Sequence, residues 1–176
     1  MKNNITSNLR YLLLTALAAG LTPAQTPGGP VCKIVFDAGK QLNATPHHVY
    51  EVETSSLGKQ SSEQISTQGS IYVTVGGRWR KSPMNMQQVQ KQEDENIRNA
   101  RNASCHYLRD ESVGGQPAEV YSAHSETTGV ISDTVVWLAK GSRRVLREEE
   151  DVNAGGEKMH WSIRVDYTNV AAPASE

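Results

Sequence analysis

The sequence of 176 residues has few aromatic residues, few cysteines and no large excess of either charge. It contains one Phe and three Trp, and its net charge is −1 at pH 7. A nearly neutral chain offers no electrostatic basis for binding nucleic acid or an anionic membrane surface. With so few rings, the core must rely on Val, Ile, Leu and Tyr together with the Trp residues. We therefore expect one domain of ordinary size and no nucleic-acid partner.

Long hydrophobic runs are also lacking, apart from a short one at the N-terminus. Lys2 and Arg10 precede an uncharged apolar run at 11–21, and Ala24 follows it. A basic start, a short apolar middle and small residues at the exit are typical of a secretory signal peptide. The alternative is a buried core helix. The run has about half of the roughly 20 residues that span a bilayer, so we expect no permanent membrane anchor. We predict a signal peptide at 1–24 and a periplasmic or secreted protein of bacterial type.

Only two cysteines occur, Cys32 and Cys105. In an oxidising compartment an isolated pair is most simply one disulfide. No Cys-x-x-Cys spacing indicates thiol redox catalysis or a zinc site. We therefore predict a disulfide that ties the first helix to a strand in the middle of the chain.

The clearest pattern that is present lies near the C-terminus, at 157–168. Apolar and polar residues alternate there through five cycles, with the apolar ones at Met159, Trp161, Ile163, Val165 and Tyr167. This period of two indicates a strand with one buried and one solvent-exposed face. We expect it to be the spine of an antiparallel sheet, with Trp161 facing the helices. The outward face then carries His160, Arg164 and Asp166.

Two segments have helical patterns. At 31–43 apolar residues recur at spacings of three and four, which is typical of a short amphipathic helix. The second segment follows Ser82 and Pro83, which we expect to be its N-cap and first helical residue. It extends over about 84–101, is rich in Gln, Glu, Asp and Asn, and has a thin apolar stripe interrupted by Glu93. We expect this second helix to be exposed and loosely docked.

Most of the remaining chain consists of strand-like segments separated by turns rich in glycine. These segments are 48–53, 71–75, 78–81, 104–113, 118–126, 131–140 and 145–152. Consecutive strands with short turns predict an antiparallel meander, and helices set apart from such a sheet are typical of the α+β class. We predict a single α+β domain at 31–170, a flexible lead-in at 25–30 and a disordered tail at 171–176.

The hairpin at 135–149 resembles a known family. It reads Val-Val-Trp-Leu-Ala-Lys-Gly-Ser-Arg-Arg-Val-Leu-Arg-Glu-Glu. It is similar to the x-Val-Trp-[Val/Ile/Leu]-x-x-x-x-Gly-Leu-Pro-Leu-[Arg/Lys]-x-Glu hairpin of the LolA-like lipoprotein-carrier and outer-membrane-lipoprotein-sorting superfamily. Here Ser142-Arg143-Arg144 replaces the Gly-Leu-Pro turn. The segment 166–173 resembles the last strand of that superfamily, and the match covers about 129–173.

The resemblance implies an incomplete barrel: a strongly curved antiparallel sheet with a short N-terminal helix and a mid-chain helix covering its concave face. In carriers of this superfamily the cavity between sheet and helices holds acyl chains. We therefore expect an exported, non-catalytic binding protein that holds a lipid or another apolar ligand there. If the concave face is incompletely filled, aromatic residues of the strands would line the pocket; otherwise they are core. These candidates are Trp79, Tyr107, Trp137, Trp161 and Tyr167.

The polar residues suggest no catalytic or metal site. His47 and His48 are adjacent on a predicted strand, so they point to opposite faces and do not easily share a metal. The other three histidines are isolated in the sequence. We expect no metal and no cofactor. No Gly-x-Ser-x-Gly is present, and no set of acid, base and nucleophile stands out, so we expect no enzyme; a hydrolase is the least favoured alternative.

Two further segments are charged, and the second of them has two interpretations. We expect the four consecutive acidic residues at 148–151 to solvate and protect an edge strand. Arg78, Arg80 and Lys81 beside Trp79 either bind an anionic head group or belong to an ordinary hairpin with solvated cations. If the core is filled, the alternative function is a structural or envelope-associated module that binds a protein partner.

Overall fold

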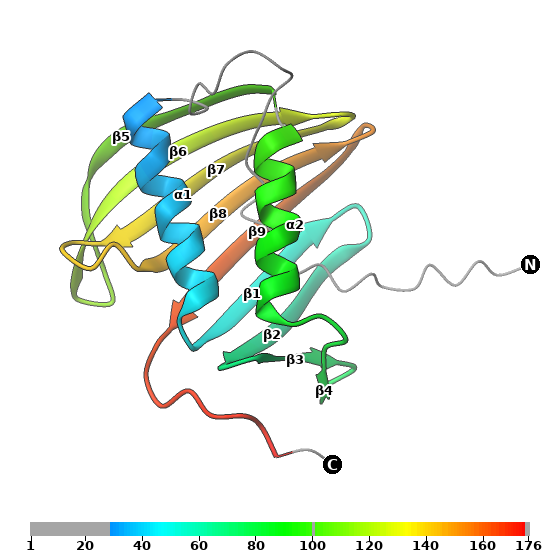
Figure 1. Cartoon of the computed structure of the whole chain (residues 1–176). Helices are drawn as coiled ribbons and strands as arrows, with labels where there is room; N and C mark the ends of the chain where they lie inside the picture. Colours follow the sequence, from blue (N-terminus) through cyan, green and yellow to red (C-terminus); the bar gives the residue numbers. More distant parts are fainter. Residues whose placement is uncertain (1–28, 100, 175–176) are drawn as a thin grey trace, which may run out of the picture.

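The structure, a computed structural model, describes residues 29–99 and 101–174, which form two helices and one nine-stranded antiparallel sheet (Figure 1). The helices are α1 (Gly29–Ala44) and α2 (Met86–Asn99), and both lie on the concave face of the curved sheet. The sheet does not close, so the predicted α+β class with an incomplete barrel is confirmed. The strands are β1 (His47–Ser55), β2 (Gly58–Thr67), β3 (Ser70–Val75), β4 (Arg78–Lys81), β5 (Arg101–Val113), β6 (Gln116–Thr127), β7 (Val130–Ala139), β8 (Val145–Ala154) and β9 (Glu157–Asp166).

The sheet consists of two meanders joined by their outermost members in the sequence. The strand order is β4-β3-β2-β1-β9-β8-β7-β6-β5, so the first strand pairs with the last. In this pairing Val49 lies opposite Val165, and Glu51 lies opposite Ile163. The strand at 157–166 is therefore the middle strand of the sheet, as its predicted role as the spine requires.

The alternation of β9 is also its burial pattern. Trp161 is 7% exposed and Ile163 is 3% exposed, whereas Arg164 on the opposite face is exposed. The buried face packs against α1, which contributes Cys32, Val35, Ala38 and Leu42 to the same cluster. Burying a large apolar side chain contributes about 1.5–3 kcal/mol. Because this one cluster joins α1 to strands of both meanders, it holds the domain together.

Two-residue turns set the register of the hairpins. At the β3–β4 turn Gly76 has φ 59° and Gly77 has φ 76°. A tight hairpin whose two central residues both have positive φ twists in the same sense as its strands, and glycine adopts that conformation without steric cost. The predicted glycine turns at 114–115 and 155–156 likewise connect β5 to β6 and β8 to β9.

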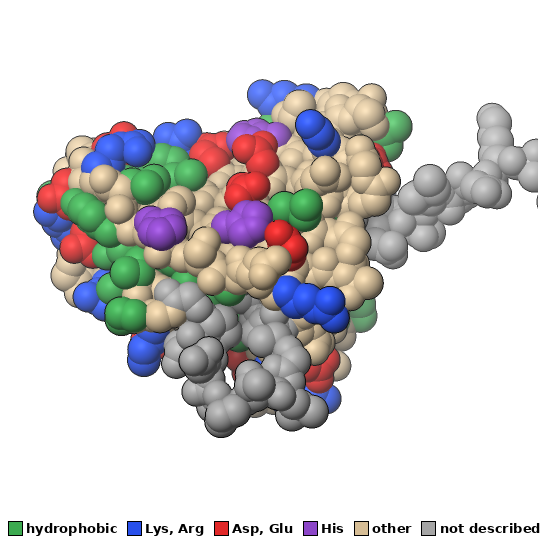
Figure 2. Space-filling model, turned by 90° about the horizontal axis from the view of Figure 1, so that it is seen from above, with side chains coloured by type: hydrophobic (Ala, Val, Ile, Leu, Met, Phe, Trp, Pro, Cys, Tyr) green, Lys and Arg blue, Asp and Glu red, His purple; other side chains and the backbone are tan. Residues whose placement is uncertain are grey.

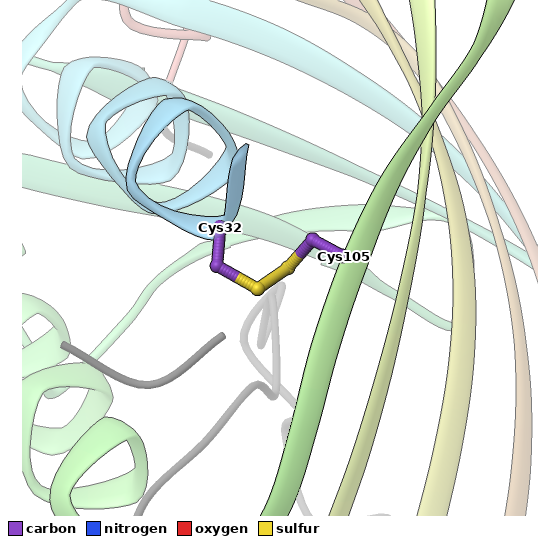
Figure 3. Close-up of a disulfide and its surroundings, with 2 residues drawn as sticks. All are labelled: Cys32 and Cys105. Atoms are coloured by element: carbon purple, nitrogen blue, oxygen red, sulfur yellow. A yellow bond between two sulfur atoms is a disulfide. The ribbon is translucent and has the colours of Figure 1, made fainter. Parts of the chain in front are cut away.

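The two cysteines form the predicted disulfide, which runs from α1 to the edge strand β5 (Figure 3). The Cα atoms of Cys32 and Cys105 are 5.0 Å apart, and both residues are buried. The bond fixes the first turns of α1 against the far end of the sheet. Helix α1 is therefore attached both covalently and by its apolar face.

Helix α2 begins later than the sequence predicted. Asn85, not Ser82, caps it: Asn85 Oδ1 accepts a hydrogen bond from Gln88 N at 3.0 Å, and Gln88 Oε1 accepts one from Asn85 N at 2.9 Å. This reciprocal pair is a capping box. The prediction of a start at Ser82–Pro83 is wrong because the Ser82 hydroxyl instead accepts a bond from the backbone of Met84 in the preceding turn.

Several predictions concern residues at the ends of the chain. The predicted signal peptide at 1–24 and residues 25–28 of the lead-in lie outside the described residues. Residues 171–174 have no regular secondary structure, and the last two residues of the predicted tail are outside the described part. Neither described helix combines the length and apolar character that crossing a bilayer requires.

Replacing both cysteines by alanine should lower the free energy of unfolding by about 4 kcal/mol, because the bond closes a long loop in the unfolded chain. The sequence separation across the disulfide is 73 residues. Urea denaturation of the oxidised wild type, the reduced wild type and the double variant measures the effect. An unchanged denaturation midpoint after reduction would contradict the expectation.

Candidate ligand-binding site

The five aromatic residues predicted to line a pocket do not lie together. Trp161 and Tyr167 belong to the cluster beneath α1, where the Tyr167 hydroxyl donates to the carbonyl of Val145 at 2.9 Å. Tyr107 on β5 lies opposite Tyr121, which belongs to that cluster, so it is on the same face of the sheet. It is nevertheless 50% exposed. Trp137 lies on the outer face of the sheet, and Trp79 lies on the edge strand β4. No single cavity can therefore use all five.

Trp137 is buried on the outer face by its own neighbours. It packs with Val120 and Leu146, and the guanidinium of Arg147 lies 4.6 Å from its ring centroid. The indole N–H donates to the carboxylate of Glu111 on β5. These contacts leave Trp137 only 7% exposed, although neither of the two described helices covers that face. A small second core with a charged cover accounts for its burial.

An open cavity lies beside the C-terminal end of α1 and along α2. Its volume is about 730 Å³, and it is bounded by the end of α1, the β2–β3 turn and one face of α2. Carbon atoms make up most of its wall, because long polar side chains contribute their aliphatic stems. Its polar groups are mainly amides and hydroxyls, and its charged residues are Lys91, Asp94 and Arg98. The wall includes Asn43, Thr67, Gln68, Met86, Gln87 and Gln90.

A second feature, missed from the sequence, is a set of buried carboxyl groups on β8. Glu148 is 0% exposed and Glu150 is 5% exposed. The prediction that 148–151 protects an edge strand is wrong, because β8 pairs with β7 on one side and β9 on the other. Alternate side chains of an interior strand must enter the core, so Glu148 and Glu150 point inwards while Glu149 and Asp151 point outwards. The short turns on both sides of β8 were the signal for this position.

Strand β1 adds two more carboxyl groups to the same face of the sheet. Directly opposed residues of neighbouring strands share a face, and β9 lies between β1 and β8. The resulting cross-strand rows are Glu51–Ile163–Glu148 and Glu53–Trp161–Glu150. Strands two apart are separated by about 9–10 Å, and alternate residues of a strand by about 7 Å. The four carboxylic acids thus stand at the corners of a small rectangle around two apolar residues.

Helix α2 contributes Glu93, which is 3% exposed. The Asn43 side chain on α1 donates a hydrogen bond to the Glu93 carboxylate. Glu93 is among the charges that act on Glu148, so the helix presents its carboxyl group to the acidic part of the sheet. The second helix is thus less exposed than predicted. Its other anchor is Val89, which packs on Ile71 and Val73 of β3.

Burial dominates the protonation of these acids. Burial raises the pKa of Glu93 to about 7, and it likewise raises the pKa of Glu51 to about 7. The pKa of Glu148 is held well above 4.5 by burial first, and then by the nearby Glu150, Glu93 and Glu51. Glu51 accepts a bond from Ser62 at 2.9 Å, and Glu150 accepts one from Ser132 at 2.5 Å. Among the residues that the structure describes, neither carboxyl oxygen of Glu148 has a hydrogen-bond partner.

The outer face has histidines beside acids, as Figure 2 shows for the side of the molecule seen from above. His160 Nδ1 lies 2.9 Å from Asp151, and His124 Nδ1 lies 2.7 Å from Asp133. These hydrogen bonds raise the pKa of both histidines. The sheet therefore brings together residues that are isolated in the sequence. Within 29–99 and 101–174, no group of three or more His, Cys, Asp or Glu is arranged to hold a metal ion.

A scan against protein-family models and a search of curated proteins give no match. Solved structures with a similar fold include LprF from Mycobacterium bovis, with 10% identity, a TM-score of 0.40 and coverage of 86% of this chain and 97% of that one. The lipoprotein LppX from Mycobacterium tuberculosis has 15% identity, a TM-score of 0.43 and coverage of 80% and 96%. MucB in complex with MucA has 12% identity, a TM-score of 0.45 and coverage of 81% and 58%. At identities below 25% and TM-scores below 0.5, this likeness concerns the fold alone and carries no statement about family or function.

Replacing Glu93 by Gln should change the pH dependence of stability. A carboxyl whose pKa rises from 4.5 to about 7 on folding binds more protons in the folded chain, so its contribution is full below pH 4.5 and is lost as the pH rises through 7. Between pH 4.5 and 8 the difference in free energy of unfolding should therefore move in favour of Glu93→Gln by roughly 3 kcal/mol. Denaturant titrations at a series of pH values measure it.

The matched control is Glu95→Gln on the same helix, outside the buried set, which should follow the wild type at every pH. His124 and His160 also contribute stability that is lost as the pH rises, because their pKa values are raised. That contribution is common to all three proteins and cancels in the difference. Parallel pH profiles for the wild type and Glu93→Gln would show that Glu93 is not buried as a neutral acid.

Proposed function

We propose that the protein is an exported, non-catalytic binding protein that holds a small amphiphilic ligand, such as a lipid, between α2 and the rest of the domain. The observation that carries the proposal is the open cavity of about 730 Å³ beside α2. Its volume is within the range of small-molecule sites, which is about 300–1,000 Å³. A wall of aliphatic stems suits an apolar chain, and the amides and hydroxyls suit a polar end.

The two helices differ in how firmly they are attached. Helix α1 has the disulfide and an apolar face with Val35, Ala38 and Leu42 in the main core. Helix α2 has one small cluster around Val89 and the buried Glu93. Elements with few buried apolar contacts open at low free-energy cost. Helix α2 is thus the element best suited to move when a ligand enters or leaves.

Export is supported by sequence features that agree with one another. The N-terminal 24 residues have the composition of a signal peptide, and both cysteines are used in one disulfide. Disulfides persist in oxidising compartments such as the bacterial periplasm. A periplasmic or secreted location is therefore part of the proposal.

Strand β5 favours the alternative function, docking of an envelope protein partner. It is an edge strand from Arg101 to Val113, and most of its residues are exposed. Tyr107 and Leu108 on it are 50% and 43% exposed. An unpaired edge of this length can accept an extended segment of another protein as an additional strand.

Filling the cavity should abolish ligand binding. Gln87→Trp places a large side chain in the cavity wall, whereas Gln92→Trp places the same side chain on α2 outside it. With the uncharged fluorophore N-phenyl-1-naphthylamine as the probe, we expect the wild type and Gln92→Trp to enhance its emission. Gln87→Trp should bind about tenfold more weakly or worse, because the probe loses most of its buried contacts.

Native mass spectrometry of protein purified without detergent provides a second measurement. We expect a small ligand to remain bound to part of the wild-type protein and to none of the Gln87→Trp variant. An unresponsive probe with the wild type, together with no retained ligand, would favour the partner-docking alternative.

A further inference from the structure

We propose that the polar end of the ligand is a positively charged ammonium group, and that Glu148, with Glu51, Glu93 and Glu150 around it, is the site that binds it. The inference rests on the binding function proposed above. It adds the charge and the chemistry of the ligand head, and it gives the buried acids a role.

Glu148 is the central observation. Its side chain is 0% exposed, and within residues 29–99 and 101–174 neither of its carboxyl oxygens has a hydrogen-bond partner. A buried acceptor without a donor costs about 1–3 kcal/mol, and more if it is charged. An ammonium group has three N–H donors and no acceptor, so it complements two free carboxylate oxygens. The protein thus holds acceptors in place for a donor that it does not itself supply.

The charges around Glu148 also favour the binding of a cation. The groups that act on it are Glu150, Glu93, Glu51 and Glu149, and all of them are acidic. Lys40 acts on Glu93, but its ammonium group is already paired with Asp94 at 3.1 Å. A buried carboxyl group such as that of Glu148, surrounded by other acids, is stabilised either by a proton or by a cation that enters from outside.

Asn43 connects this set to the open cavity. Its side chain lines the cavity and donates to the Glu93 carboxylate. A ligand whose chain occupies the cavity can therefore present its head to Glu93 in place of the Asn43 amide. The four acids lie outside the residues that line the cavity, so the head of an alkylammonium ligand meets Glu93 by displacing the Asn43 amide.

The protonation of the buried acids predicts how binding of the ammonium group depends on pH. Burial raises the pKa of Glu51 and of Glu93 to about 7, so these groups are largely neutral in the free protein below that pH. A bound ammonium favours the charged carboxylate and lowers its pKa. Binding must therefore release protons below pH 7, and the affinity for the ammonium must increase as the pH rises from 6 to 8.

The test compares three probes that share a ten-carbon chain: decylammonium, decanol and decanoate. Isothermal titration calorimetry with the wild-type protein, in two buffers of different ionisation enthalpy at pH 6 and pH 8, gives affinity and proton release. We expect decylammonium to bind about tenfold more tightly than decanol or better, with proton release at pH 6.

The outcomes separate this inference from the proposed function. If none of the three probes binds, the binding function itself fails. Equal binding of all three, or tightest binding of decanoate, leaves the binding function standing and overturns the ammonium site. Decylammonium binding without proton release at pH 6 would overturn the role of the buried acids.

Glu148→Gln tests the site directly, because it keeps the shape of the side chain and removes its charge. We expect about a tenfold loss of decylammonium affinity with unchanged decanol affinity. Asp151→Asn, on the outer face of the same strand, is the matched control and should bind like the wild type. Glu51→Gln serves as a second variant if Glu148→Gln does not fold. Unchanged decylammonium affinity in a folded variant of either Glu148 or Glu51 would overturn the proposal.

Discussion

The burial of Glu148 is the constraint on which the middle of this structure depends. In the described part of the chain its carboxyl group has no hydrogen-bond partner, and it shares its surroundings with Glu51, Glu93 and Glu150. Burial and the repulsion between neighbouring acids favour the neutral forms of Glu51, Glu93 and Glu148. Glu93 comes from α2 and the other acids come from the sheet. The closed position of α2 over the sheet is therefore tied to protons, or to a cation that takes their place.

The fold provides the two parts that such an arrangement needs. The pairing of β1 with β9 joins the meanders into one curved surface, and α1 is fixed on it by the disulfide and by the cluster around Trp161. This half of the domain is held together by the disulfide and by the main core. Helix α2 covers the other half through the small contact at Val89 and through the acids. A firm scaffold beside a weakly held helix is suited to admitting and releasing a ligand.

Local patterns in the sequence predict much of this fold, whereas the site depends on contacts between distant segments. Alternation predicted the buried face of Trp161, because a strand with one wet face has a period of two. No local pattern in the sequence predicts the pairing of β1 with β9, because it joins residues more than a hundred positions apart. The prediction that Glu148 belongs to a solvated edge strand is wrong. It rests on the rule that acidic residues are rarely buried, whereas the short hairpins on both sides place β8 inside the sheet. Trp137 was assigned to the pocket by residue type, but its position in β7 puts it on the outer face.

The most direct measurement is a titration of the glutamate side-chain carboxyl carbons by ¹³C NMR, with Glu148 assigned by the resonance that disappears in Glu148→Gln. We expect the Glu148 resonance to keep the chemical shift of the protonated acid while exposed glutamates ionise, because its pKa lies well above 4.5. Glu51 and Glu93 should titrate at about pH 7. A Glu148 carboxyl that ionises together with the exposed glutamates would contradict the claim that Glu148 is a buried neutral acid in the free protein and binds a cation.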